Sequence, residues 1–233
     1  MSPTTIVHAT DTLAQLATRR AGASRVFHRH NLDFCCHGQI RLDEACAKKG
    51  LDVDALIREI EAEASHAAPL EPWQERAIPE LIAHIVTRYH EPHRQELPRL
   101  LAMAERVEKV HGDKPTCPRG LAALLAGLAG ELAQHMQKEE QILFPMLARG
   151  EGANATRPIQ VMEQEHEDAG AVLAAMRALA TDYQPPVDAC GTWRALYLGL
   201  DEFERELMQH VHLENYVLFP ALAAQRKESE DKR

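Results

Sequence analysis

The sequence is poor in aromatic residues and lacks an even set of cysteines for disulfide pairing. Phe, Trp and Tyr make up 5% of its 233 residues, and the five cysteines, two of them adjacent, are a poor basis for a disulfide framework. The odd count favours a reducing compartment, so we expect a cytoplasmic protein. Long alternating runs of Val, Ile and Thr are missing, whereas Ala and Leu are abundant. This composition predicts an all-α protein.

Features typical of nucleic-acid-binding, membrane and secreted proteins are also missing. The formal net charge is -9 and no basic run occurs, which argues against a nucleic-acid partner. The most apolar stretch, residues 120–133, is too short and too rich in glycine to span a bilayer. The first residues lack a cationic segment followed by an apolar core, so we expect no signal peptide. We therefore expect no nucleic acid and no membrane as partners.

Several catalytic motifs are absent as well. The sequence has no Gly-rich phosphate loop, no G-x-S-x-G and no H-E-x-x-H, so a zincin site has no support. An E-x-x-H motif of the ferritin type occurs once, at 163–166, where the ferritin-like fold uses two. Histidine, by contrast, is abundant, with 13 residues.

The C-terminal two thirds of the chain contain four long segments with helical periodicity. Proline lies near the start of each segment or in the joint before it, where its missing N–H costs little. Short joints between long helices predict an antiparallel four-helix bundle over 78–233. The predicted helices span about 78–110, 118–147, 158–181 and 192–224.

The N-terminal part predicts a small helical domain over 1–66, followed by a linker with two prolines over 67–77. Residues 11–30 are amphipathic and predict a helix. Gly50 is predicted to end a helix in the left-handed conformation. Asp52 is predicted to cap the start of the next one.

One short motif occurs twice. HMQKEEQILFPML at 135–147 and HVHLENYVLFPAL at 210–222 match at six of 13 positions, including a histidine and the glutamate four residues later. His90 and His166 lie 76 residues apart, close to the offset of 75 between the two motifs. Amphipathic helices alone would repeat apolar positions, and not a histidine and a glutamate. The chain therefore predicts two helical hairpins of common plan.

The repeated residues are of metal-ligating types. Positions i and i+4 share one face of a helix, so each H-x-x-x-E presents an imidazole and a carboxylate to one point in the bundle core. One histidine from each remaining helix completes four imidazoles and two carboxylates. This set suits two iron or manganese ions with bridging carboxylates. The candidate ligands are His90, His135, Glu139, His166, His210 and Glu214.

A single helical histidine is usually a satisfied polar residue, and a single H-x-x-x-E is usually an exposed pair. The register between the two copies favours metal binding instead. It also selects His90 over its neighbours His84 and His93. His212 follows His210 by two residues and is predicted to point the opposite way, toward solvent.

Other acidic residues and the prolines near the motifs also carry predictions. Pro145 and Pro220 each follow the motif glutamate by six residues and should kink or loosen the helix just beyond the ligands. The Leu-Phe-Pro stretch itself is predicted to serve packing and helix termination. Pro92 conflicts with the helix predicted around it. Three glutamates are candidates for outer partners of the ligand imidazoles or for a cation route, with an ordinary charged helix face as the alternative. They are Glu131, Glu165 and Glu206.

The motifs RYHEPHRQELP, HMQKEEQILFPM, EQEHEDAG and HVHLENYVLFP resemble the hemerythrin-like di-iron domain. With NLDFCCHGQIRLDEAC in front of them, the whole chain resembles the RIC family (repair of iron centres). The resemblance carries the family's ligands onto the same six residues. It implies a non-haem di-iron centre, with or without an oxo bridge. It also implies repair of iron–sulfur clusters damaged by nitric oxide or oxidative stress, by iron supplied to damaged proteins or a cluster scaffold.

The resemblance extends to Cys35 and Cys36, which match the double-cysteine signature of the family. His37 stands where a glycine is expected, which questions any loop geometry with a positive φ there and adds a ligand candidate. The pair is a candidate for a redox couple, an iron-transfer site or a nitrosation target. Simple packing in a small core is the alternative.

Three functions remain open at this stage. The first is iron–sulfur cluster repair. The second is the binding, buffering or reduction of nitric oxide, and only turnover to nitrous oxide would make the protein an enzyme. The third, O2 carriage, is less favoured because hemerythrin sites use more histidine and need no cysteine domain. The sequence also leaves open whether the chain forms a homodimer.

Overall fold

The protein is described here by a computed structural model, which covers residues 6–151 and 154–221. The regular elements of these residues are helices, apart from one isolated bridge between Thr12 and Arg41. The all-α prediction is thus confirmed. The described chain divides into a small unit, residues 6–77 with 208–221, and a bundle unit, residues 78–151 with 154–207. The domain boundaries at 66 and 77 stay predictions.

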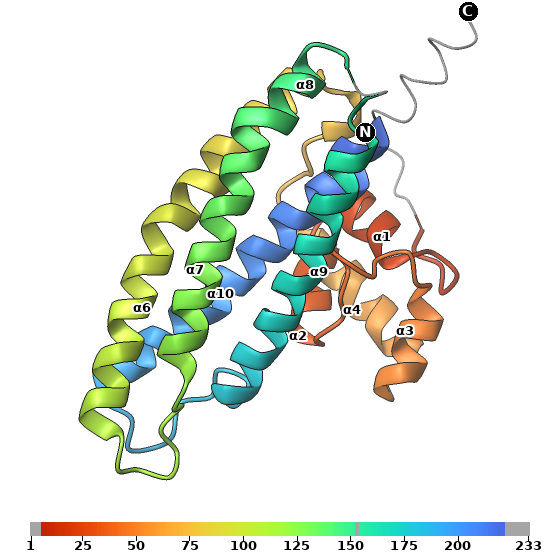
Figure 1. The fold of residues 1–233 in the computed structure, drawn as a ribbon. Helices are drawn as coiled ribbons and strands as arrows, with labels where there is room; N and C mark the ends of the chain where they lie inside the picture. The colour runs from red at the N-terminus through yellow and green to blue at the C-terminus, as the bar shows by residue number, and fades with distance from the viewer. Residues whose placement is uncertain (1–5, 152–153, 222–233) are drawn as a thin grey trace, which may run out of the picture. The chain divides into compact units, whose positions relative to one another are not determined.

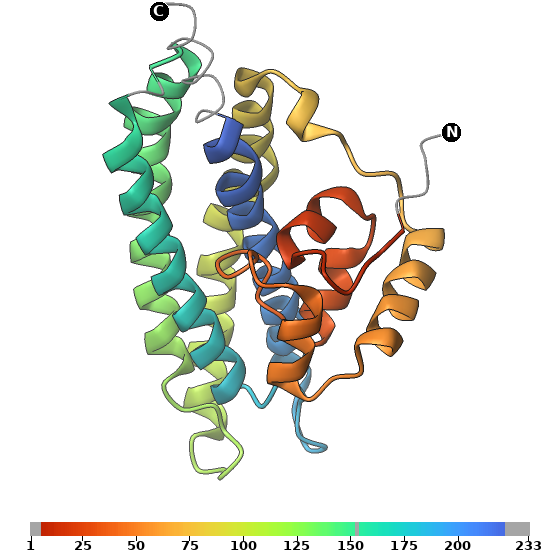
Figure 2. The same cartoon turned by 90° about the vertical axis from the view of Figure 1, so that its right-hand side faces the viewer.

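Long helices lying alongside one another form the bundle unit (Figures 1 and 2). Helix α7 packs against α6 and α9. Helix α10 contacts α6 through Phe203 and His93, and α9 through Glu204 and Arg177. Each helix therefore has two neighbours, as the predicted four-helix bundle requires. The elements are α5 (Ile78–Ile85), η2 (Val86–His90), α6 (Glu91–His111), α7 (Leu121–Lys138), η3 (Glu139–Leu143), α8 (Phe144–Ala148), α9 (Thr156–Leu179) and α10 (Gly191–Leu213).

A stripe of leucines on α7 shows how the core positions the motif. Leu121, Leu125, Leu128 and Leu132 recur on one helix face, and all are buried. His135 continues the same face and is also buried. Because the apolar stripe turns this face inward, the histidine and the glutamate that follow it enter the core as well.

The helix is loosened beside each motif proline, as predicted, but it does not end at the proline. The helix continues beyond Pro145 to Ala148, and it continues through Pro220 to Ala221, where the described residues end. Leu-Phe-Pro thus lies within the last helical turns, and in the first copy the helix ends three residues after Pro145, at Ala148. The wide turn lies before the proline: the residue preceding it donates its N–H to the carbonyl of the motif glutamate, five residues back.

These wide turns are π-helical, and they coincide with candidate ligands. Turn η3 begins at Glu139, and η5 (Glu214–Leu218) begins at Glu214. Turn η2 ends at His90, just before Pro92 at the start of α6, so a π turn accommodates the proline that conflicted with a regular helix. Single π turns are frequent at functional sites because they re-aim side chains within a helix.

The small unit consists of short helices and of the chain over 208–221. The predicted helix over 11–30 is wrong as one element, because Gly22 adopts a φ of 80° and separates α1 from α2. Gly50 ends α3 in the left-handed conformation, and the Asp52 side chain accepts hydrogen bonds from the first turn of α4, as predicted. The elements are α1 (Leu13–Arg19), α2 (Ala23–Arg29), α3 (Leu42–Lys49), α4 (Val53–His66), η1 (Trp73–Glu75) and η5.

Gly38 is a site where the small unit tolerates no side chain. A Cβ added there would lie 2.4 Å from the Phe34 carbonyl oxygen and 2.9 Å from the Ala14 Cβ. We therefore expect Gly38→Ala to lower the free energy of unfolding by about 1–3 kcal/mol in urea denaturation. Gly127→Ala is the matched control, because a Cβ within α7 meets nothing within 4 Å. That change should raise stability by about 0.5–1 kcal/mol. Equal effects of the two changes would contradict this packing.

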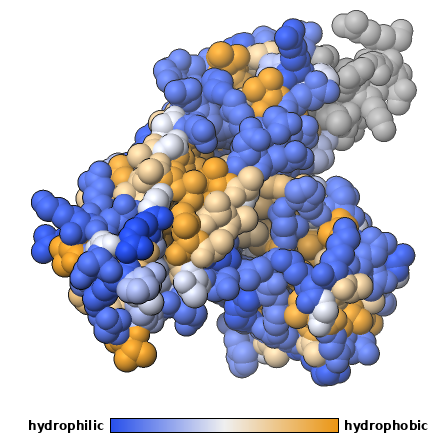
Figure 3. Space-filling view, turned by 60° about the horizontal axis from the view of Figure 1, so that its bottom comes forward, coloured by the Kyte–Doolittle hydropathy of each residue, from blue (hydrophilic) through white to orange (hydrophobic). Residues whose placement is uncertain are grey.

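The surface is largely hydrophilic, with apolar patches between the polar regions on the face seen in Figure 3. Among the described residues, none of the helices combines the length and the apolar character needed to cross a membrane.

Candidate metal centre

Four of the six candidate ligands converge inside the bundle unit. His90 ends η2, His135 and Glu139 lie one turn apart across the end of α7, and His166 lies on α9. All four are buried, and Glu139 is 0% exposed. One carboxylate oxygen of Glu139, Oε2, lies 3.4 Å from His90 Nε2 and 3.4 Å from His135 Nε2. The Nε2 atoms of His135 and His166 are 3.1 Å apart.

The other two candidates lie in the small unit, His210 in the last turn of α10 and Glu214 at the start of η5. His210 and Glu214 are both 0% exposed. The His210 Nε2 atom lies 3.1 Å from Glu214 Oε1. The pair thus repeats the arrangement of His135 and Glu139, with an imidazole and a carboxylate on one helix face.

The outer nitrogens of two imidazoles face carboxylates. His90 Nδ1 lies 2.8 Å from Glu140 Oε1, and His135 Nδ1 lies 2.9 Å from Glu165 Oε2. An ionised carboxylate only accepts hydrogen bonds, so each Nδ1 donates its N–H to the outer carboxylate, and Nε2 is the nitrogen that a metal beside Glu139 would use. This is the tautomer that a metal-ligating histidine requires.

The two outer carboxylates are held ionised. Burial opposes the charge of Glu140, but hydrogen bonds from His90 and Arg94 outweigh it and lower the pKa of this carboxyl. Burial likewise opposes the charge of Glu165, and hydrogen bonds from Lys138 and His135 lower its pKa. Both groups therefore remain acceptors at neutral pH.

The donor set fits a metal. Three buried imidazoles and a carboxylate in one unit, and a further imidazole and carboxylate in the other, are borderline and hard donors that suit iron or manganese. The ligating atoms of His135, Glu139 and His166 lie within 4.8 Å of one another, close enough to address one ion. A fully buried carboxylate with two imidazole Nε2 atoms at 3.4 Å is a donor arrangement that a cation would fit.

Comparison with known proteins places the chain in a family. Residues 81–222, a range that includes all six candidate ligands, match the Hemerythrin HHE cation binding domain. Residues 9–64 match ScdA_N, a domain of unknown function (DUF542). The chain is 51% identical over 208 residues to the iron-sulfur cluster repair protein YtfE of Yersinia pseudotuberculosis serotype O:1b (strain IP 31758), covering 89% of this chain and 94% of the relative. YtfE of Yersinia pestis (strain Pestoides F) is 50% identical with the same coverage.

The chain belongs to the RIC family. Its hemerythrin-like domain is the candidate metal centre, and the ScdA_N match covers the double cysteine. The buried imidazoles and carboxylates described above are the residues of this RIC protein that could bind a metal ion.

The cysteine pair of this RIC protein lies in the loop between α2 and α3. The Sγ atoms of Cys35 and Cys36 are 3.6 Å apart, too far for a disulfide bond. Cys35 is buried and Cys36 is half-buried. His37 does not adopt a positive φ, and its Nδ1 lies 2.6 Å from Asp33 Oδ2. The glycine expected at this position is therefore not needed for the backbone.

His212 does not face solvent, and that prediction is wrong. It is 5% exposed, its Nδ1 lies 3.3 Å from the Phe34 carbonyl oxygen, and its Nε2 lies 3.1 Å from Thr18 Oγ1. Burial lowers its pKa to about 4, so the ring is neutral at neutral pH. The prediction placed it opposite His210, but another part of the small unit covers that side.

The three outer glutamates predicted from the sequence have different surroundings. Glu165 contacts His135, as described above. Glu131 is exposed on α7, and Glu206 is half-buried in an ion pair of 2.5 Å with Arg88. Glu140, which contacts His90, was missed, because its partner lies 50 residues away and no local pattern marks it.

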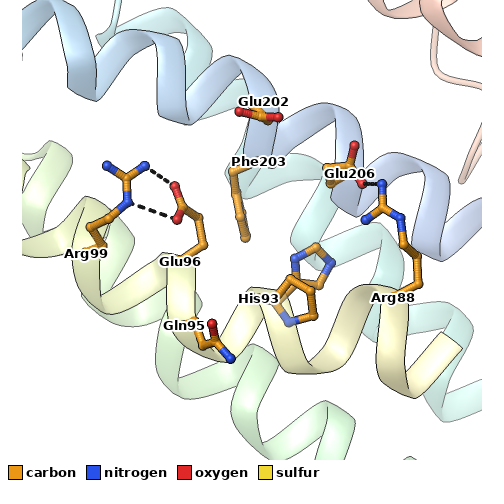
Figure 4. Close-up of a pocket in the computed structure, with 9 residues that line it drawn as sticks. Arg88, His93, Gln95, Glu96, Arg99, Glu202, Phe203 and Glu206 are labelled. Atoms are coloured by element: carbon orange, nitrogen blue, oxygen red, sulfur yellow. Dashed lines mark hydrogen bonds and ion pairs between the residues drawn. The ribbon is translucent and has the colours of Figure 1, made fainter.

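Glu206 lines a cleft of about 520 Å³ between α6 and α10 in the bundle unit (Figure 4). His93, a competitor of His90 for the ligand role, is buried against Phe203 at its wall, with ring centroids 5.3 Å apart. Arg99 pairs with Glu96 at one end of the cleft, and Arg88 pairs with Glu206 at the other. Guanidiniums thus pair with both of these carboxylates, and a role of Glu206 in a cation route stays a prediction.

The contact between Glu140 and His90 gives a test of the outer shell. We expect Glu140→Gln to weaken iron binding by about 10–100-fold, because the amide no longer fixes the His90 tautomer or raises its basicity. Competition with a ferrous chelator measures the change. Glu105→Gln, an exposed change on α6, is the control. Equal affinities in the two variants would show that Glu140 does not orient the ligand.

Proposed function

We propose that the protein is a cytoplasmic di-iron protein that restores iron–sulfur clusters damaged by nitric oxide or oxidative stress, by supplying iron. The six candidate ligands His90, His135, Glu139, His166, His210 and Glu214 would together hold the two irons, which would supply the redox-active ferrous centre. The observation that carries the proposal is the buried set of imidazoles around Glu139 in a chain half identical to proteins named for cluster repair. A single match over 81–222 supports one centre for all six residues.

The chemistry of the ligands favours iron release to a cluster. The bound ions would be the source of ferrous iron for repair. Any coordination position that the protein leaves open would bind nitric oxide or O2 as a small ligand. The chain's own ligands are nitrogen and oxygen donors and include no thiolate, whereas a cluster acceptor offers thiolate and sulfide. Thiolate and sulfide are softer donors than imidazole and carboxylate and compete well for iron. Transfer of iron from this centre to a damaged cluster protein or scaffold is therefore favourable. Glu140 and Glu165 accept the Nδ1 protons of His90 and His135, which leaves the Nε2 atom of each imidazole for the metal.

Reactivation of a damaged enzyme tests this function. The full chain is loaded with Fe²⁺ without air and mixed with a dehydratase whose cluster has been damaged by nitric oxide, with a reductant present. The enzyme should regain activity at iron concentrations where a weak chelator blocks repair by free Fe²⁺. Glu139→Gln should lose this ability, and Glu105→Gln should keep it. Equal recovery with Glu139→Gln, or no recovery beyond that of free iron, would refute iron supply.

The same ferrous protein also distinguishes cluster repair from the alternative function, the binding or reduction of nitric oxide. Nitric oxide added to the ferrous protein should bind and produce nitrosyl absorption under either function. Sustained production of nitrous oxide with many turnovers per chain, together with failure to reactivate the dehydratase, would favour nitric oxide reduction over repair.

A further inference from the structure

The cysteine loop brings a second group of metal-ligating atoms together, separate from the residues of the metal centre. Ligating atoms of Asp33, Cys35 and Cys36 all lie within 4.8 Å of one another. The Cys35 Sγ atom is 3.6 Å from Cys36 Sγ and 3.3 Å from Asp33 Oδ1. Cys36 and Asp33 are half-buried, so the group can be reached from solvent.

These separations are close to those of a tetrahedral metal site. Two thiolates bound at about 2.3 Å to one tetrahedral ion lie about 3.8 Å apart, and a thiolate and a carboxylate oxygen bound to it lie about 3.6 Å apart. The loop needs shifts of only a few tenths of an ångström to meet both values. A disulfide would require the sulfur atoms to approach to about 2.05 Å.

The loop is held in this shape by bonds that do not use the thiols. Asp33 Oδ1 accepts the backbone N–H groups of Cys35 and Cys36 at 3.1 and 2.9 Å. Asn215 Nδ2 donates to the Cys35 carbonyl at 2.8 Å, and the Tyr216 hydroxyl donates to the Cys36 carbonyl at 3.0 Å. Both carbonyls are thus fixed by the π turn that begins at Glu214, so the site is preorganised.

We infer that Asp33, Cys35 and Cys36 form a second metal site, which takes one borderline divalent cation of the Fe²⁺ class. Two thiolates and one carboxylate leave a fourth tetrahedral position open, as in sites that exchange ligands rather than in closed structural sites. The mixed sulfur and oxygen donors also distinguish the site chemically from the centre of imidazoles and carboxylates. The inference stands on this loop alone and does not depend on the repair function.

Binding must displace protons from the thiols. The hydrogen bond with Cys36, burial and the nearby Asp33 charge all raise the pKa of Cys35, which is therefore a thiol at neutral pH before a cation arrives. Each thiol that becomes a metal thiolate releases its proton to solvent, so one ion releases about two protons. No change of oxidation state is involved.

Titration of the reduced full chain with Co²⁺ without air tests the site. Cobalt bound to thiolate gives an intense near-ultraviolet charge-transfer band that imidazole and carboxylate ligands do not give. We expect one such band per chain, accompanied by release of about two protons per ion at this site. In the variant with both Cys35→Ser and Cys36→Ser the band should vanish, while the visible bands of cobalt bound in the bundle remain. Those remaining bands show that the double variant is folded.

Two further variants sharpen the test. Cys46→Ser changes another buried cysteine of the small unit and should keep the full band. Asp33→Asn keeps an oxygen that accepts the two N–H groups but removes the charge, so it should weaken cobalt binding at this site by about tenfold or more. A wild-type chain without the band, a band that survives the double cysteine change, or a band lost with Cys46→Ser would overturn the inference.

Discussion

Glu139→Gln should remove most of the iron that the protein binds. Its Oε2 atom lies between the Nε2 atoms of His90 and His135, so the change takes the anion from the middle of the ligand set. The loss of affinity should exceed the roughly 10–100-fold expected for an outer partner such as Glu140. Iron analysis after gel filtration without air measures it, and Glu105→Gln is the exposed control.

The stability of Glu139→Gln relative to the wild type, measured by thermal unfolding, should depend on whether iron is present. Without metal, Glu139→Gln should be at least as stable as the wild type, because burying an amide costs less than burying a carboxylate. With Fe²⁺ at about 100 times its Kd, the wild type should gain about 2.7 kcal/mol and the variant much less. A variant that is destabilised equally in both conditions would show that Glu139 has a structural role instead of a metal-binding one.

The second large effect concerns Glu204, which joins α10 to α9. This buried carboxylate pairs with Arg177 Nε at 3.0 Å and accepts a hydrogen bond from the Tyr183 hydroxyl. Burial raises the pKa of Glu204, and the bonds from Tyr183 and Arg177 oppose that rise. Glu204→Ala removes the nearest and most buried anion from a largely buried guanidinium, whose other carboxylates, Asp182 and Asp201, lie 3.7 and 3.8 Å away and are more exposed. We therefore expect a loss of about 3–5 kcal/mol in the free energy of unfolding.

Urea denaturation of a small set of variants checks this value. Glu202→Ala, on the exposed side of the same helix, should change stability by less than about 0.5 kcal/mol. Combining Glu204→Ala with Arg177→Met should recover much of the loss, because no buried charge remains. A single Glu204→Ala variant as stable as the Glu202→Ala control would mean that the ion pair does not join the helices.

Predictions from the sequence succeeded where a local rule or the internal repeat applied. Gly50 and Asp52 end and begin helices by backbone chemistry that acts within a few residues, and both predictions are confirmed. The repeat selected His90 and His166 from 13 histidines, and the structure buries both and places each beside another candidate ligand. Their assignment as ligands stays a prediction until metal is measured.

The failures at His212, Glu140 and Asn215 involve contacts between distant residues. His212 is buried because the backbone of Phe34, 178 residues earlier, covers it. Glu140 and Asn215 lie on helix faces that periodicity marks as polar, and only tertiary contact with His90 and Cys35 gives them roles. The π turns were missed because helical periodicity assumes one repeat length, whereas a proline nearby favours a locally wider turn.

The centre itself is tested most directly by iron analysis and Mössbauer spectroscopy of the full chain loaded with Fe²⁺ without air. The account predicts about two irons per chain as one coupled pair in the wild type, the arrangement expected of a carboxylate-bridged centre in a bundle core. It predicts less than about one iron, without coupling, when Glu139→Gln and Glu214→Gln are combined. A single uncoupled iron in the wild type, or an unchanged pair in the double variant, would contradict it.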